Sequence, residues 1–165
     1  MTNMAANLRG SIPMAPPIIR PAREEEYDEI ARIWMESWVS TGLIEAGKFS
    51  LAQMRARIPR EVENGWCLFV ADAEGTLAAM LALHLPKLRL HQIFVAPEYQ
   101  GKKVGRQLLA FTREKLPDEI RLRCVRENEK AWRWYEREGF VFEKEQVDPM
   151  TGFALKYYRW KRQEA

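Results

Sequence analysis

The stretch from Leu88 to Leu109 contains the residues best suited to binding an anion. An apolar, strand-like run ends at Pro97, and a turn that carries Gly101 and Gly105 then leads into a helix. Glycine lets main-chain N–H groups approach an anion closely, and the first turn of a helix adds unpaired N–H donors and the positive end of the helix dipole. This spacing predicts a phosphate-binding loop, although ordinary connections between a strand and a helix also carry glycine.

Two segments of this half of the chain resemble the signature motifs of one protein family. The segment from Gln100 to Gly105, QGKKVG, resembles the Gln/Arg-x-x-Gly-x-Gly/Ala pyrophosphate loop of the GNAT acetyltransferase superfamily. The segment from Asn128 to Phe140 is similar to the family's second signature, Asn-x-x-Ala-x-x-aromatic-Tyr-x-x-x-Gly-Phe, without a gap. Because both motifs occur in the right order, the chain is identified as a member of this superfamily. The resemblance implies an N-acetyltransferase with acetyl-coenzyme A (acetyl-CoA) as cosubstrate.

The resemblance also implies the GNAT fold, an α/β (α+β) arrangement of about seven strands in a mixed central sheet with four helices. In this family the fourth and fifth strands are parallel and splay apart at a bulge, and acetyl-CoA lies in the wedge between them. The corresponding edge of the fourth strand is Ile93, Phe94 and Val95. Its main-chain groups would pair with the pantetheine arm, and an N–H near Val95 would polarise the thioester carbonyl. Alternatively, Ile93 and Val95 are core residues of a fully paired strand.

The phosphate loop departs from the family pattern at one position, because Lys103 stands where glycine is most common. Ordinary helical backbone angles would tolerate lysine there, whereas a strained angle would disfavour it. The resemblance implies that the loop residues that bind the cofactor are Gln100, Gly101, Lys102, Lys103, Val104, Gly105 and Arg106.

Two residues of the second signature have candidate roles in the reaction. Tyr135 matches the family tyrosine that protonates the departing coenzyme A thiolate, because a phenol stays neutral well above physiological pH. The alternative for Tyr135, which lies among tryptophans, is a core position. Asn128 is a candidate cofactor contact and also a good N-cap for the helix that follows, and the two roles can coexist.

A base is needed because an acceptor amine with a pKa of about 10.4 is protonated at neutral pH. Members of the family often place a carboxylate on the fourth strand for this purpose, but this chain has none there. It offers His91, four residues before Val95 and therefore expected on the same face of the strand. If His91 is structural, a relay through water takes its place. The other histidine is His84, and two histidines without convergent acidic or cysteine ligands predict no metal site.

Apolar periodicity and turn residues predict the elements that position these groups. Strands are expected at residues 18–20, 66–71, 76–84, 88–95, 120–125, 140–147 and 153–160. Helices are expected at residues 24–38, 51–64, 105–115 and 128–138. The helix at 105–115 connects the strands before and after it, so these two strands should be parallel.

Length and composition indicate one domain. The chain has 165 residues of which 47% are hydrophobic, which suits a single core over residues 18–165. Residues 1–17 include three prolines and are expected to form a mobile tail. The absence of an apolar run long enough for a membrane span or a signal peptide predicts a cytoplasmic protein. Cys67 and Cys124 lie in apolar runs and are expected to be reduced, buried thiols.

The charge pattern limits the partners. With 26 basic and 23 acidic residues the formal net charge is +3, and the two signs are interspersed, which does not indicate a nucleic-acid surface. Lys102, Lys103 and Arg106 nevertheless concentrate positive charge beside the predicted phosphate loop.

The expected activity is direct acetyl transfer in a ternary complex to a small-molecule or peptide amine, with Trp38 to Ser50 as the wall of the acceptor site. The alternative is a catalytically weak coenzyme A-binding sensor or interaction module. The final antiparallel strands offer an edge at which two copies could form a homodimer.

Overall fold

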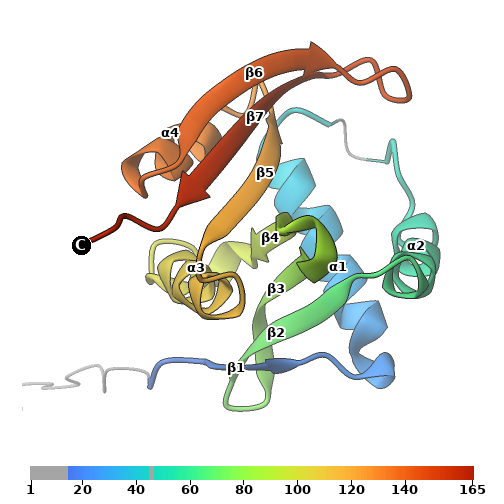
Figure 1. Ribbon diagram of the computed structural model, residues 1–165. Coiled ribbons are helices and arrows are strands. Elements are labelled where there is room, and N and C mark those ends of the chain that lie inside the picture. Colours follow the sequence, from blue (N-terminus) through green and yellow to red (C-terminus); the bar gives the residue numbers. More distant parts are fainter. Residues whose placement is uncertain (1–14, 45–46) are drawn as a thin grey trace, which may run out of the picture.

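The computed structural model describes residues 15–44 and 47–165, in which seven strands form one sheet with four α-helices around it (Figure 1). Residues 1–14 of the expected N-terminal tail lie outside the described residues. The strands are β1 (Ile18–Pro21), β2 (Cys67–Ala73), β3 (Thr76–His84), β4 (Arg89–Val95), β5 (Glu119–Val125), β6 (Val141–Val147) and β7 (Ala154–Lys161). The α-helices are α1 (Tyr27–Ser40), α2 (Leu51–Glu63), α3 (Val104–Lys115) and α4 (Glu129–Arg137).

The strand order is β1-β2-β3-β4-β5-β7-β6, and every neighbouring pair is antiparallel except β4 and β5. The exception follows from α3, because a helix that crosses over between two strands returns the chain in the same direction. The predicted mixed seven-stranded sheet with four helices and parallel fourth and fifth strands is therefore confirmed.

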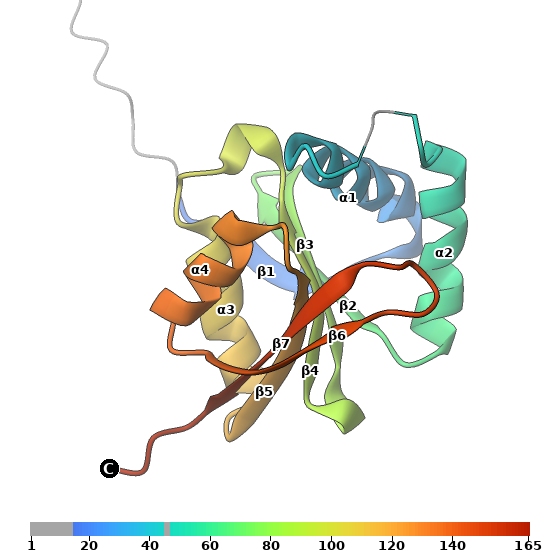
Figure 2. The ribbon, with the colours of Figure 1, turned by 90° about the horizontal axis from the view of Figure 1, so that it is seen from above.

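Helices cover both faces of the sheet, with α1 and α2 on one side and α3 and α4 on the other (Figure 2). Each side has its own apolar cluster. Ile30, Trp34 and Met80 belong to the cluster beneath α1 and α2, whereas Leu81 and Leu108 belong to the cluster beneath α3 and α4. Strand β3 contributes to both clusters, which explains why it reads as a continuous apolar run rather than an alternating one.

Strands β4 and β5 are paired at only one position. Arg89 lies opposite Arg121, and the main-chain N–H of Arg121 donates to the carbonyl of Leu88 over 2.7 Å. Beyond this point β4 remains paired with β3, and β5 remains paired with β7. The two parallel strands therefore open into a wedge toward their carboxyl ends.

A β-bulge in β4 changes the direction of one candidate catalytic side chain. Leu90 pairs with Leu83 and Gln92 pairs with Ala82, so His91 is an extra residue without an opposite partner in β3. Val95 packs against the cluster on the α3 side, whereas His91 contacts Trp66, which belongs to the cluster on the α1 side. The expectation that His91 and Val95 share a face is wrong, because the extra residue breaks the two-residue alternation.

Both cysteines are free thiols. Cys124 is buried as expected, whereas Cys67, the first residue of β2, is only partly buried, so the expectation of a buried thiol is wrong for Cys67. Among the helices in residues 15–44 and 47–165, none combines the length and apolar composition needed to cross a bilayer.

Candidate functional site

The wedge between β4 and β5 opens into a cavity of about 610 Å³. Its walls come from α1, α2, the segment between them, the splayed parts of β4 and β5, the start of α4 and the β6–β7 turn. In Figure 2 that turn extends over the sheet toward α2, so segments distant in the sequence meet around the opening. The volume lies within the range of small-molecule sites.

The β4 edge turns main-chain groups into this wedge. The N–H of Ala96 donates to the carbonyl of Ala78 over 2.8 Å, which assigns Ala96 to a hydrogen-bonded pair of the β3–β4 ladder. In an antiparallel ladder the pairs alternate, so the main-chain groups of Val95 and Ile93 point away from β3. The carbonyl of Val95 accepts hydrogen bonds from the Ser37 hydroxyl and the Gln100 side-chain amide, each over 3.1 Å. These contacts fix the edge beside the wedge.

The loop before α3 has the form of an anion cradle. Gly101 has φ +77°, and no heavy atom lies within 4 Å of the place where a Cβ would sit. Lys103 is the N-cap residue of α3 and makes no side-chain cap hydrogen bond, so the N–H groups of the first turn are left open. Open donors at the positive end of a helix suit a phosphate group, and this loop therefore fits the pyrophosphate of acetyl-CoA.

Two positions of the loop behave differently from the glycines of a simple turn. Lys103 adopts φ +64° and ψ +13°, which is the left-handed conformation that favours glycine and disfavours lysine. Gly105 is an ordinary helical residue, and a Cβ there would lie 3.5 Å from the Trp134 ring and 4.0 Å from Val95. A Cβ at Gly105 would make ordinary van der Waals contact, whereas a larger branched side chain would press on α4 and β4.

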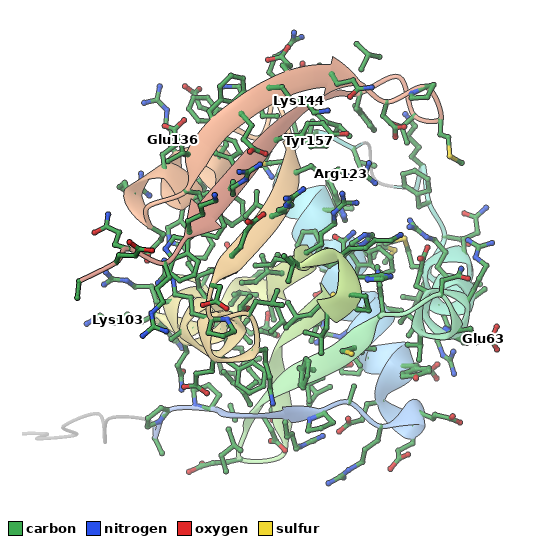
Figure 3. The ribbon with its side chains drawn as sticks, in the orientation of Figure 1. Glu63, Lys103, Arg123, Glu136, Lys144 and Tyr157 are labelled. Carbon is green, nitrogen blue, oxygen red and sulfur yellow. The ribbon has the colours of Figure 1, made fainter. Side chains whose placement is uncertain are left out.

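The charged side chains around the cradle differ in their contacts. Lys102 lies over the ring of Tyr99, with 5.4 Å between its Nζ and the ring centroid. Arg106 donates to Glu138 over 3.3 Å, a partly exposed pair that contributes little to stability. Figure 3 shows Lys103 beside the start of α3, on the side of the molecule away from Arg123.

Tyr135 of α4 and Asn128 at its N-cap line the cavity. The Tyr135 ring is buried and packs against Trp134 and Phe140, with ring centroids 5.1 and 5.6 Å away. Burial raises the pKa of Tyr135, so its phenol is protonated throughout the physiological range. Asn128 caps α4 by accepting from the N–H of Ala131 over 3.4 Å, and both it and Tyr135 line the cavity.

His91 is neutral and already hydrogen-bonded. Its Nδ1 accepts from the indole N–H of Trp66 over 3.0 Å, which assigns the proton of the neutral ring to Nε2. Burial, together with the positive charges of Arg89 and Arg123, lowers the pKa of His91 to about 4. In this arrangement one ring nitrogen is engaged as an acceptor and the other is a donor, so neither is open to receive a proton.

The expected acceptor wall is part of the cavity. Trp38 and Val39 at the end of α1 and Ile44, Gly47 and Phe49 in the segment before α2 line it, whereas residues 45 and 46 lie outside the described residues. Trp38 packs against Phe94 of β4, with ring centroids 5.7 Å apart. The wall is thus attached directly to the edge of the wedge.

Sequence reasoning missed the basic residues of the cavity. Arg57 and Arg60 of α2, Arg89 of β4 and Arg123 of β5 all line it. In the sequence Arg123 alternates with apolar residues of its strand, a pattern typical of a solvent-exposed face, and nothing in a single strand indicates what lies opposite. One signal was available in the sequence. Arg89 lies two residues before His91, and residues two apart in a strand are expected on the same face of the sheet.

A wedge between two parallel strands, with a phosphate cradle at one end and a buried tyrosine beside it, defines an acyl-coenzyme A-dependent transferase. The sequence profile of the acetyltransferase (GNAT) family matches residues 26–140, and the chain belongs to that family. It is an acetyl-CoA-dependent N-acetyltransferase.

Similar proteins include one from Thermoplasma acidophilum described as spermidine N(1)-acetyltransferase, which is 30% identical over 133 residues, covering 76% of this chain and 81% of the relative. The fold is also similar to the PaiA N-acetyltransferase of Thermoplasma acidophilum in complex with coenzyme A. That structure has a TM-score of 0.65 and 24% identity, covering 90% of this chain and 100% of the other. An acetyltransferase from Thermus thermophilus has a TM-score of 0.75 and 18% identity, covering 90% and 99% of the two chains.

Proposed function

We propose that this enzyme transfers the acetyl group of acetyl-CoA directly to a primary amine within a ternary complex. The observation that carries the proposal is that one cavity is lined both by the β4 edge and α4, which suit the cofactor, and by the wall from Trp38 to Phe49, which suits an acceptor. Two substrates that meet in one cavity can react without an intermediate bound to the enzyme.

A second observation supports direct transfer over an acyl-enzyme route. Cys124 is the cysteine that lines the cavity in the described part of the chain. Its burial raises the pKa of the thiol to about 12, so it stays protonated at neutral pH. The thiolate is the nucleophilic form of cysteine, and Cys124 is therefore a poor acetyl carrier.

In the proposed reaction the amine nitrogen attacks the carbonyl carbon of the thioester, the new C–N bond forms, and the C–S bond breaks with its electron pair moving to sulfur. Tyr135 donates its phenolic proton to that sulfur. The N–H of Val95, which points away from β3, polarises the carbonyl oxygen during the attack.

The amine must lose a proton before or during this attack. Of the two routes compatible with the sequence, His91 itself or a chain of water, the hydrogen-bonding of His91 favours water. Nδ1 already accepts from Trp66, and a base with a pKa of about 4 is weak toward an ammonium group. His91 would then position a water through its Nε2–H group.

The test is the release of coenzyme A thiol in the presence of a panel of amines, followed by initial rates at varied concentrations of both substrates. Direct transfer predicts intersecting double-reciprocal lines, whereas parallel lines would indicate an acyl-enzyme and refute the proposal. Coenzyme A binding without thiol release for any amine would favour the sensor function. The unfavourable backbone angle of Lys103 in the cofactor loop is the reason to test that alternative.

We also infer that the enzyme works in the cytoplasm. Cys67 and Cys124 are both free thiols, and reduced cysteines are typical of that compartment.

A further inference from the structure

Four arginines lie on one face of the sheet where β4, β5 and β7 meet. Arg89 pairs across the parallel ladder with Arg121, and Arg121 pairs across the antiparallel ladder with Arg159. Arg123 lies two residues after Arg121 and therefore on the same face. Like charges that are directly opposite one another in a sheet are destabilising unless anionic groups compensate them.

Only two of these four arginines form an ion pair with a carboxylate. Glu119 pairs with Arg121 over 2.5 Å, and Glu143 pairs with Arg159 over 2.6 Å. Among the described residues no carboxylate lies within 4.0 Å of the guanidinium groups of Arg89 or Arg123. Burial and the positive charge of Arg123 lower the pKa of Arg89, as expected for neighbouring like charges.

The acidic groups that line the cavity have hydrogen-bond or ion-pair partners of their own. Asp148 lines the same cavity, but its two oxygens accept from the Thr151 hydroxyl over 2.8 Å and from the N–H of Met150 over 3.3 Å. The other carboxylate of the described cavity, Glu61, pairs with Arg57 over 3.4 Å. Arg89 and Arg123 thus present positive charge to the inside of the cavity without a direct carboxylate partner in the part of the chain that the structure describes, and Arg123 contributes, after the hydrogen bond from Thr151, to the lowered pKa of Asp148.

Much of the remaining wall is apolar and aromatic, although Arg57, Arg60 and Glu61 of α2 also line the cavity. Trp38 and Phe49 come from the acceptor wall, Met54 comes from α2, and Phe94 comes from β4. Figure 3 shows Arg123 close to Tyr157 and Lys144 on the β5–β7–β6 side, opposite the helices that carry this apolar surface. A molecule that fills the cavity therefore meets an apolar surface bordered by the charged residues of α2 on one side, and Arg89 and Arg123 on the other.

We propose that Arg89 and Arg123 bind a carboxylate of the acceptor, so that the acceptor is a primary amine with both a carboxylate and an apolar body, such as an amino acid with a large apolar side chain. This inference rests on the proposed function and names the substrate class of the same cavity. Guanidinium groups bind carboxylates through charge-assisted hydrogen bonds, often two at a time. A polyamine, by contrast, would bring further positive charge toward two arginines that already repel one another.

The experiment compares acceptors that differ only in the charge of one group. Phenylalanine is compared with phenylalaninamide, and 6-aminohexanoate with hexylamine, so that two spacings between amine and carboxylate are sampled; spermidine is included. In at least one pair we expect the acid to have a kcat/KM about tenfold or more above that of its uncharged partner, as expected when a hydrogen bond to a charged group is lost.

Two variants and a matched control assign the preference to the arginines. Arg89→Gln and Arg123→Gln should each reduce the ratio of kcat/KM for the acid to kcat/KM for its uncharged partner. Arg121→Gln lies on the same face of β5 but is paired with Glu119, and it should retain the preference. Calorimetric binding of phenylalanine in the presence of coenzyme A gives a readout that does not depend on turnover.

Each outcome has one meaning. If uncharged amines or spermidine are used as well as the acids, the carboxylate subsite is refuted and the proposed function stands. If no amine releases thiol but phenylalanine binds to wild type and not to Arg123→Gln, the subsite stands and the proposed function fails. Equal binding to wild type and to both variants refutes the subsite.

Discussion

Replacing His91 with glutamine should make the stability of the protein less sensitive to acid. In the folded protein the pKa of His91 is about 4, below the ordinary value of 6.5, because of burial and the charges of Arg89 and Arg123. Between these two values the unfolded chain binds a proton that the native protein does not, so the free energy of unfolding falls as the pH falls. Above pH 6.5 both states are neutral and the contribution is fully present.

The magnitude follows from the two pKa values. When the pH falls from 8 to 5, the free energy of unfolding falls by about 2 kcal/mol, because each pH unit below the unfolded pKa of 6.5 costs about 1.36 kcal/mol. Because the ring is partly exposed, solvent screening reduces this to about 1 kcal/mol. Glutamine does not titrate, and its side-chain oxygen can accept the indole N–H of Trp66 in place of Nδ1. The His91→Gln variant should therefore lose about 1 kcal/mol less than wild type over this pH range.

Urea unfolding followed by tryptophan fluorescence at pH 8 and pH 5 measures this difference. His84→Gln is the comparison variant, because it removes the other histidine of the chain and leaves His91 in place, so its acid loss should be closer to that of wild type than the loss of His91→Gln is. Equal losses in wild type and His91→Gln would refute the electrostatic description of the site. The His91→Gln variant also distinguishes the two routes for the proton of the amine. A water relay predicts that the variant retains most of the turnover, whereas a histidine base predicts a large loss.

Three further variants test the cofactor side of the cavity. Tyr135→Phe should lower kcat by about a hundredfold or more with little change in coenzyme A affinity, and wild-type turnover, measured where chemistry limits the rate, would remove Tyr135 from the reaction. Gly105→Val should abolish coenzyme A binding measured by calorimetry, whereas Gly105→Ala should retain it, since a Cβ fits at 3.5 Å from Trp134. Equal affinities of the two variants for coenzyme A would contradict the packing described at this position. Lys103→Gly should raise the free energy of unfolding by up to about 1 kcal/mol by relieving the left-handed angle, and a lower melting temperature would argue against strain there.

Most of the architecture could be predicted from the sequence. Apolar periodicity located the strands and helices, and the helix between β4 and β5 required those strands to be parallel. The resemblance of the glycine-bearing loop and of the second motif to the family's signatures led to the edge at Ile93 to Val95 and to Tyr135, and their roles in binding and proton transfer stay predictions.

The parts that could not be predicted depend on pairing between strands. The side-chain direction of His91 follows from a bulge that is defined only against β3, and no glycine near His91 marks it. The cluster of Arg89 and Arg123 depends on β5 lying between β4 and β7, which is a property of strand order. The angle of Lys103 is set by the loop as a whole and has no signal in its residue type.

The single pair between β4 and β5 also determines how the sheet opens. Because Arg89 and Arg121 form the one rung between them in the described residues, the hydrogen-bonded network consists of two halves, β1 to β4 and β5 with β7 and β6. Units of this kind exchange their amide hydrogens through separate opening events. A substrate arm that lies in the wedge and bonds to both edges supplies the missing rungs. Slower exchange would then extend across both halves, and the mechanical continuity of the sheet becomes a property of the complex rather than of the protein alone.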